Sequence, residues 1–380
     1  MEEWKEYKLG DVLTIKYGKD HKQLADGDIP IYGSGGIMRY GERSLYDSPS
    51  ILIPRKGSLN NVIYADKPFW TVDTMFWSII NASIANPLFV YYSICKKDFA
   101  SLNVGSAVPS LTVPVIEDID ILLPSKATQD KVVSVLKSLD DKIELNRHIN
   151  DNLEQQAQAL FKSWFVDNPN SNWKKISLSE VASFVGGYSY TGKELTDFSN
   201  VAMATIKNFV RNGGFKAGGF KGINPSAKLK ECHYANLFDI LVAHTDLTQN
   251  ADVIGNTELL LTCGKYNSII FSMDLVKVLP KEIFPYRFLL ATMLKNKMFK
   301  GHCLGYINGT TVLHLNKKAL PEFEIRKPSD SEAKIMNEIL APYYKRMAKL
   351  LQETDKLISL RDTLLPKLMS GEVKINETNN

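Results

Sequence analysis

The sequence has few cysteines and no long apolar segment. Its four cysteines, Cys95, Cys232, Cys263 and Cys303, form no CxxC pair, which leaves neither a disulfide framework nor a structural zinc site. No apolar run approaches the roughly 20 residues that a membrane helix needs, and residues 1–11 are too charged for a signal peptide. We therefore expect a soluble cytoplasmic protein that binds no metal and no membrane.

Charge is almost balanced over the chain but is unevenly distributed. The 46 Lys and Arg residues against 42 Asp and Glu give a net charge of +4, by itself a weak indication of a nucleic-acid partner. Residues 1–124 hold 12 basic and 15 acidic side chains, or −3, whereas residues 171–328 hold 20 and 12, or +8. One segment of the chain therefore carries the whole excess of positive charge.

The chain contains an internal repeat, and a repeat decides the architecture before any motif does. The opening residues match again after 169 positions, and an apolar triplet at Ile51 matches Ile240 after 189. The strongest match pairs residues 105–112 (GSAVPSLT) with residues 309–316 (GTTVLHLN) after 204 positions. The growing offset means that the second copy holds about 35 extra residues, most of them before Ile240.

Residues 128–166 and 332–370 are nearly free of glycine and proline and carry apolar residues at heptad spacing. At 1.5 Å per residue each helix is about 55 Å long. Ordinary amphipathic helices packed on their own domains are the alternative, but the matched seams favour helices that pair with each other. The residues expected to pair them are Leu136, Leu139, Ile143, Leu153, Leu160, Leu340, Tyr343, Met347, Leu357 and Leu364.

The segments before the helices, residues 1–127 and 167–331, contain short β-rich runs broken by Gly, Asn and Pro. Each also has an apolar stretch, near Pro87 or Pro285, that could form a short helix. We therefore expect two mixed α/β domains, with residues 371–380 as a tail.

This order of domain, long helix, domain, long helix resembles the specificity subunit of Type I restriction-modification enzymes. The resemblance rests on the openings WKEYKLGDV and WKKISLSEV, on IDILLPS and FEIRKPS before the helices, and on LEQQAQALFKSWF and LLPKLMSGEV at their ends. It implies two target-recognition domains, each reading one half of a split double-stranded DNA site. It also implies that the helices form an antiparallel coiled coil with pseudo-twofold symmetry, whose length sets the spacer.

The resemblance further implies partners that carry the chemistry. Two methyltransferase subunits, which bind S-adenosylmethionine and methylate adenine, would dock on the helices. Motor-nuclease subunits that use ATP and Mg²⁺ would join them for restriction. The chain itself would bind no cofactor and would not be an enzyme.

Reading a base requires side chains with paired donors and acceptors on loops that reach a groove. Polar loops follow the matched strands of both copies, and we expect base contacts there, although a solvated surface hairpin is the alternative. The candidates in these loops are Arg55, Lys56, Ser58, Asn60, Asn61, His244, Thr245, Asp246, Thr248, Gln249 and Asn250.

Two further sets are candidates for contacts to the DNA backbone. Glycine-rich stretches let the main chain approach phosphates, although turns that need positive φ explain them equally well. These candidates are Gly33, Ser34, Gly35, Gly36, Arg39, Gly187, Tyr188 and Lys193. A basic stretch among phenylalanines in the +8 segment supplies Lys207, Asn208, Arg211, Asn212 and Lys216.

No catalytic residue emerges from the sequence. Residues 187–194 almost fit the phosphate-binding pattern GxxxxGK[ST], but Glu194 occupies the position of the required hydroxyl. His314 has no neighbouring pattern that would make a triad, and we interpret it as a packing or capping residue. The alternatives left open are the specificity subunit of a related Type II system, a methyltransferase or nuclease, and a coiled-coil protein without DNA.

Overall fold

The computed structural model describes residues 4–211 and 213–375, which belong to two compact units. Unit 1 comprises Met1–Asp141 and Ile358–Asn380, and unit 2 comprises Lys142–Leu357. Each unit therefore contains one domain and a stretch of both long helices. No helix among the described residues is long and apolar enough to span a membrane.

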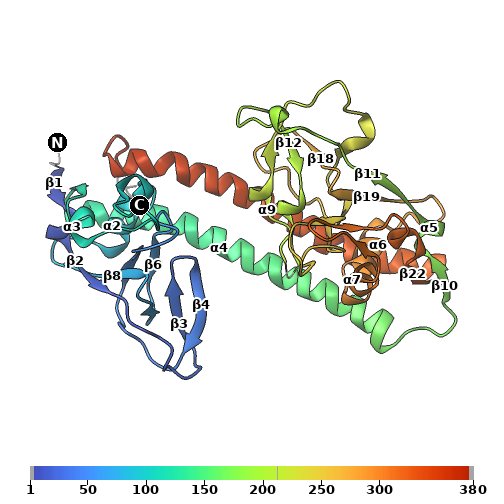
Figure 1. Cartoon of the computed structure of the whole chain (residues 1–380), viewed down its shortest axis with the longest axis horizontal. Helices are drawn as coiled ribbons and strands as arrows, with labels where there is room; N and C mark the ends of the chain where they lie inside the picture. Colours follow the sequence, from blue (N-terminus) through green and yellow to red (C-terminus); the bar gives the residue numbers. More distant parts are fainter. Residues whose placement is uncertain (1–3, 212, 376–380) are drawn as a thin grey trace, which may run out of the picture. The chain divides into compact units, whose positions relative to one another are not determined.

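Unit 1 is built on an antiparallel four-stranded sheet. The bounds of its strands are β1 Lys5–Lys8, β2 Leu13–Tyr17, β3 Ile29–Gly33, β4 Gly36–Gly41, β5 Ser50–Pro54, β6 Ile63–Ala65, β7 Trp70–Thr71, β8 Met75–Ile80 and β9 Asp120–Leu123. The short helices are α1 Leu9–Val12, α2 Pro87–Ile94 and α3 Val113–Glu117. The main sheet has the order β2-β8-β5-β6, a second sheet has the order β4-β3-β7, and β1 pairs with β9 (Figure 1).

Unit 2 repeats this plan with additions. Its strands are β10 Lys174–Ser177, β11 Ala182–Gly186, β12 Val201–Ala204, β13 Lys221–Gly222, β14 Tyr234–Ala235, β15 Ile240–Ala243, β16 Thr245–Asp246, β17 Thr257–Leu259, β18 Ser268–Phe271, β19 Leu275–Pro280, β20 Ile307–Asn308, β21 Leu313–Leu315 and β22 Glu324–Lys327. The helices are α5 Leu178–Val181, α6 Arg287–Leu294, α7 Lys297–Leu304 and α8 Ala319–Glu322. The main sheet, β11-β19-β15-β17, has the same antiparallel order as its counterpart in unit 1.

The two units share individual backbone contacts as well as topology. A Cβ at Gly18 would collide with the carbonyl oxygen of Val72, and a Cβ at Gly187 would collide with that of Ser272. These two glycines occupy equivalent positions, 169 residues apart, where two segments of main chain approach closely. The internal repeat is therefore a repeat of structure, and close packing accounts for the glycine at position 187.

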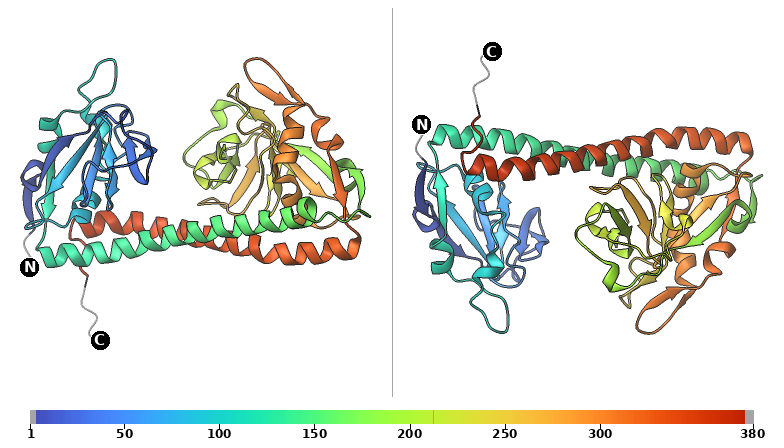
Figure 2. Two further views of the ribbon diagram at one scale, coloured as in Figure 1. Left: turned by 90° about the horizontal axis from the view of Figure 1, so that it is seen from below. Right: turned by 90° about the horizontal axis from the view of Figure 1, so that it is seen from above.

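The two long helices are α4, Lys126–Lys162, which continues into one π-helical turn at Ser163–Asp167, and α9, Asp330–Met369. Within each unit, the stretches of α4 and α9 lie side by side and run in opposite directions (Figure 2). All ten residues predicted to pair the helices are buried or half-buried. The prediction of two α/β domains with long antiparallel coiled-coil helices is confirmed.

Polar contacts join the helices within each unit. In unit 1 the Arg361 guanidinium donates to the Asp140 carboxylate at 2.8 Å. In unit 2 the buried amide of Asn146 donates to the Thr354 hydroxyl at 3.3 Å and to the Glu353 carboxylate at 3.2 Å. Polar residues inside such a seam fix its register.

Helix α9 also packs against the domain of unit 2. Tyr344 is almost fully buried, whereas its neighbour Tyr343, which the heptad pattern predicts for the seam, is only half-buried. The Tyr344 ring stacks on Phe288 with centroids 5.8 Å apart, and its hydroxyl lies 2.9 Å from that of Thr292. The helix therefore has two packing faces, so both interpretations of its apolar pattern hold in part.

Candidate nucleic-acid interface

The polar loops after β5 and β15 occupy equivalent places in the two units. The carbonyl of Arg55 accepts a hydrogen bond from the Leu111 amide at 2.9 Å, and the carbonyl of His244 accepts one from the Leu315 amide at 2.8 Å. Each loop is thus joined to the segment that carries the strongest sequence repeat. We call this combination the reading edge, formed by residues 55–61 with 105–110 in unit 1 and by residues 244–250 with 309–314 in unit 2.

The reading edge presents a projecting turn in both units. Lys56 lies opposite Ser110 in unit 1, as Thr245 lies opposite His314 in unit 2. In Figure 2 a teal loop in unit 1 and an orange hairpin in unit 2 each extend away from the helices of their own unit. An exposed edge of this kind is accessible to a partner as large as a DNA duplex.

In unit 1 the reading edge contacts the glycine-rich turn between β3 and β4. The Asn61 amide donates to the carbonyl of Ser34 at 2.8 Å, and Gly57 lies against the Ser34 side chain. Ser34 and Gly35 form the tip of this turn, and Gly36 follows with a φ of +115°. The structure therefore brings two of the predicted sets together.

Other predicted side chains of unit 1 are engaged to different degrees. Lys56, Ser58 and Asn60 are exposed, although the Asn60 amide also donates to the Asp98 carboxylate at 3.0 Å. The half-buried guanidinium of Arg55 lies 5.5 Å from the centroid of the Tyr17 ring. The Arg39 side chain donates to the carbonyls of His21 and Leu24, both at 2.7 Å. Arg39 therefore braces its own loop. Gly33, at the end of β3, is buried.

In unit 2 a groove of about 700 Å³ joins the reading edge to the basic stretch. The residues that line it are Ile206, Lys207, Phe209, Val210, Arg211, Lys216, Gly218, Gly219, Phe220, Lys221, Asp246, Leu247, Thr248 and Val253. Four cationic side chains thus share a concave surface with apolar groups and with three residues of the reading edge. A groove of this composition suits a polyanion with apolar ring faces.

A small hairpin carries Arg211, one of the basic residues of this groove, and Lys216 directly follows it. Phe209 pairs with Phe215 across it, and the turn contains Gly213 and Gly214, both with positive φ. We call residues 209–211 and 213–215 the groove hairpin. Asn212, a predicted contact residue, lies outside the described residues. Arg211 and Lys216 are exposed on or beside this hairpin.

Four predicted contact residues of unit 2 are buried, among them Tyr188 and Asn208. The Asn208 side chain accepts from the Thr205 amide at 2.9 Å and donates to the Lys216 carbonyl at 2.9 Å. The Tyr188 hydroxyl donates to the Glu194 carboxylate, and only 1% of Tyr188 is exposed. These side chains therefore support the surface from below, and a contact of either one with DNA stays a prediction.

The Glu194 carboxylate has structural partners. A hydrogen bond from Tyr188, followed by those from the Thr191 and Ser226 amides, lowers its pKa to about 2. A carboxylate that stays ionised at neutral pH repels phosphate. Lys193 beside it is exposed.

The loop after β15 has a defined internal structure. The Asp246 carboxylate accepts from the Thr248 amide at 2.8 Å, and the Gln249 amide donates to the Thr310 carbonyl at 2.7 Å. Thr245 and Asp246 are buried, whereas Gln249 and Asn250 are exposed. The exposed amides, rather than the buried positions, are therefore available to a partner.

Sequence analysis missed the second half of each reading edge. The repeat marks the turns at residues 105–110 and 309–312 without indicating a contact there, and the sequence predicts a packing or capping role for His314. His314 is exposed and its ring nitrogen lies 3.4 Å from the Thr245 hydroxyl. Burial lowers the pKa of the neighbouring His244, which is therefore neutral at pH 7. The strength of the repeat match at these turns was the available signal.

The described residues contain no group of three or more His, Cys, Asp or Glu side chains that could hold a metal ion. The four cysteines are free thiols, and burial raises the pKa of Cys303 to about 12. Such a thiol is protonated and unreactive at neutral pH.

Comparison with known proteins matches nearly the whole chain. A family model described as "Type I restriction modification DNA specificity domain" matches residues 1–155 and 170–359. The chain is 22% identical over 460 residues to the Type I restriction enzyme HindI specificity subunit of Haemophilus influenzae, covering 98% of this chain and 100% of that protein. It is 24% identical over 403 residues to the MjaIX specificity subunit of Methanocaldococcus jannaschii, covering 98% and 89%. The fold is similar to the crystal structure of a Type I restriction-modification S subunit from M. genitalium, with a TM-score of 0.61 at 17% identity over 99% and 97% of the two chains.

Proposed function

Because the chain belongs to the family of Type I restriction-modification DNA specificity proteins, we propose that it selects the DNA target of a multisubunit restriction-modification enzyme without being catalytic itself. The observation that carries this proposal is the duplicated reading edge, in which one backbone framework recurs with different exposed side chains. A framework that is constant while its exposed groups change is suited to reading two different sequences.

Each unit would read one half of a split double-stranded site. At equivalent positions of the edge, unit 1 has Ser58 and Asn60 where unit 2 has Leu247 and Gln249. Amide side chains can pair with adenine, and an exposed leucine can contact a thymine methyl group. Different half-sites follow from these differences.

The two units would also bind the DNA backbone unequally. The groove of unit 2 combines Lys207, Arg211, Lys216 and Lys221, whereas residues 1–124 carry a net charge of −3. Phosphate contacts supply sequence-independent affinity that depends on salt. Most of this affinity would therefore come from unit 2.

The long helices would set the spacer and dock the catalytic partners. We propose two methyltransferase subunits, which bind S-adenosylmethionine, and motor-nuclease subunits, which use ATP and Mg²⁺. Exposed apolar residues on the helices, Leu145, Ile335, Ile339 and Leu360, are 41–57% accessible and could contact such subunits. Adenine methylation and ATP-dependent cleavage would then belong to the assembled complex.

The salt dependence of DNA binding tests the proposed function. The triple variant Lys207→Ala, Arg211→Ala, Lys216→Ala, assembled with the methyltransferase subunits, should lower the slope of log K against log salt by about 2 to 3, since each phosphate contact contributes about 0.9. Lys334→Ala on helix α9 is the control. An unchanged slope in the triple variant would contradict the assignment of the groove, and binding of S-adenosylmethionine by the isolated chain would contradict the non-catalytic role.

A further inference from the structure

Glu258 is a buried carboxylate in the middle of unit 2. It lies on β17, opposite Leu241 of β15, and only 4% of the residue is exposed. A buried charge costs several kcal/mol unless it is paired and hydrogen-bonded. The partners of Glu258 therefore explain why a carboxylate is present at this position.

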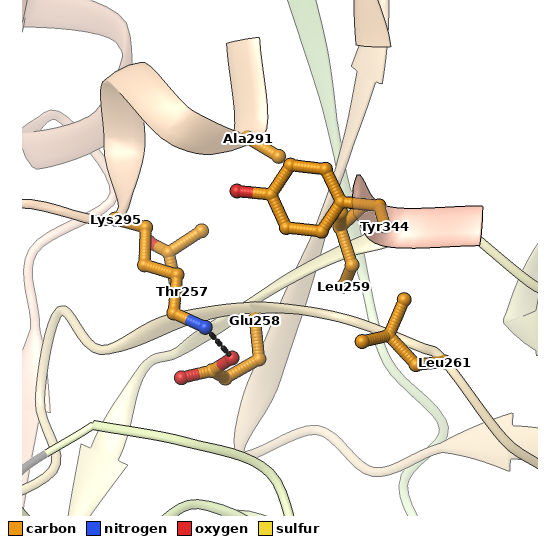
Figure 3. A pocket seen from close by; sticks show the side chains of 7 residues that line it. All are labelled: Thr257, Glu258, Leu259, Leu261, Ala291, Lys295 and Tyr344. Carbon is orange, nitrogen blue, oxygen red and sulfur yellow. Dashed lines mark hydrogen bonds and ion pairs between the residues drawn. The ribbon is translucent and has the colours of Figure 1, made fainter. Parts of the chain in front are cut away.

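One carboxylate oxygen of Glu258 belongs to an ionic cluster. It accepts from the Lys295 ammonium at 2.5 Å, and the same ammonium lies 3.0 Å from the Glu154 carboxylate on α4. Figure 3 shows Lys295 and Glu258 pointing toward each other below the ring of Tyr344. Burial alone favours the neutral amine of Lys295 and raises the pKa of Glu258, but the carboxylates of Glu258 and Glu154 raise the pKa of Lys295, so its ammonium stays charged.

The other carboxylate oxygen of Glu258 reaches the groove hairpin. It accepts from the backbone amide of Gly214 at 2.6 Å. Gly213 and Gly214, with φ values of +95° and +104°, carry no side chain that could anchor their end of the turn, whereas the Arg211 guanidinium lies 3.5 Å from the Asp252 carboxylate. The buried carboxylate therefore supplies the acceptor that holds the turn to the sheet.

A second tether holds the other end of the same turn. The Asn256 amide donates to the carbonyl of Val210 at 2.9 Å, and its oxygen accepts from the Lys300 ammonium at 2.8 Å. An acceptor at one end and a donor at the other together define the position of the groove hairpin. Arg211, which lines the groove, lies between these two tethers.

We propose that Glu258 is a positioning residue for DNA binding: through the Gly214 amide it holds the groove hairpin so that Arg211 and Lys216 reach the DNA backbone. This inference rests on the proposed function of the groove. An apolar side chain could fill the volume of Glu258 but could not accept the amide. A glutamine could accept it but would lack the charge that pairs with Lys295.

The test compares three variants of the full chain, assembled with its methyltransferase subunits. Glu258→Leu removes the acceptor, Glu258→Gln keeps one, and Glu154→Gln disturbs the same cluster from helix α4 without touching the hairpin. Glu258→Leu should lower the salt slope of DNA binding by about 1 to 2 and weaken binding at low salt about tenfold. Glu258→Gln should retain most of the slope, and Glu154→Gln should leave it unchanged.

Hydrogen exchange at Gly214 provides a readout that does not depend on DNA. The amide should exchange faster in Glu258→Leu and stay protected in Glu258→Gln, while the amides of β15 stay protected in both. If Glu258→Leu does not fold, Glu258→Asp replaces it in this measurement. Its carboxylate is one methylene shorter, so the Gly214 amide should exchange faster than in the wild type.

Equal effects of Glu258→Leu and Glu154→Gln would overturn the inference, because the cluster would then act only on stability. Unchanged Gly214 protection in the Leu or Asp variant would also overturn it. If the triple lysine and arginine variant leaves the salt slope unchanged, the proposed function of the groove fails instead. A lowered slope in that variant with a normal slope in Glu258→Leu would contradict the positioning role alone.

Discussion

The amide of Leu111 donates to the carbonyl of Arg55 at 2.9 Å. Leu315, 204 residues after Leu111, makes the same contact with His244, which lies 189 residues after Arg55. This hydrogen bond uses only main-chain atoms, so it tolerates any side chain at the positions around it. It holds two segments together at the reading edge of each unit. The edge can therefore vary its base-contacting side chains without losing its shape.

Gln249 is expected to determine part of one half-site. Its amide nitrogen is bonded to the Thr310 carbonyl, which orients the side chain at the exposed edge of unit 2. Gln249→Ala should relax discrimination at one base pair by about 1–3 kcal/mol. Methylome sequencing of a host that expresses the complete system would measure this. Ser58→Ala in unit 1 is the matched control and should leave discrimination at this base pair unchanged. If Gln249→Ala changed only the other half-site, the assignment of Gln249 would be wrong.

Asn146 should fix the register of the helices at a cost in stability. It is fully buried, and its amide oxygen is without a hydrogen-bond partner among the described residues. The double variant Asn146→Leu, Thr354→Val, which replaces the amide and its buried partner hydroxyl together by apolar groups, should therefore raise the free energy of unfolding by about 1 kcal/mol. Urea denaturation measures this change. Thr354→Val, which removes only the partner hydroxyl, should instead destabilise the chain.

The contact between Arg361 and Asp140 should stabilise unit 1. The Arg361 side chain is 23% exposed and Asp140 also accepts from the Tyr92 hydroxyl at 2.6 Å. Arg361→Met should lower the free energy of unfolding by about 1–3 kcal/mol, because it leaves the half-buried Asp140 carboxylate with one partner fewer. Lys96→Met breaks an exposed ion pair 3.5 Å from Asp362 and should change stability by less than about 0.5 kcal/mol. Equal costs for the two variants in thermal unfolding would contradict this prediction.

The start of helix α9 should weaken in acid. Hydrogen bonds from Ser329, and then from Trp173 and Asn170, lower the pKa of Glu332 to about 2. A lowered pKa means that the stabilisation is complete above the ordinary glutamate value and is lost as the pH falls toward 2. Glu332→Gln should therefore destabilise the chain by about 1 kcal/mol at pH 7, the usual size of a capping contribution.

The difference between the wild type and Glu332→Gln should shrink between pH 5 and pH 2. Urea denaturation at several pH values measures it. Glu338→Gln, an exposed carboxylate further along the same helix, controls for the general loss of negative charge. A difference that stays constant with pH would contradict the assigned role of Glu332.

The regular elements follow from local patterns in the sequence. Runs such as IPIYG and SILIP form β3 and β5, and the glycine-poor heptad segments form α4 and α9. These patterns are readable because each depends on residues a few positions apart, where apolar periodicity selects strand or helix directly. The repeat also placed the polar loops at equivalent positions, since the backbone of both units follows one plan.

The accessibility of the candidate site was decided by tertiary structure. Nothing in the sequence distinguishes exposed Asn250 from buried Asn208, because burial depends on segments that are distant along the chain. Glu258 looks like an ordinary charge in a strand until Lys295 and Gly214 are brought to it from 37 and 44 residues away. The sequence by itself determined the duplicated plan and its helices, through short-range periodicity. Only long-range packing decided which polar groups face a partner and which hold the surface in place.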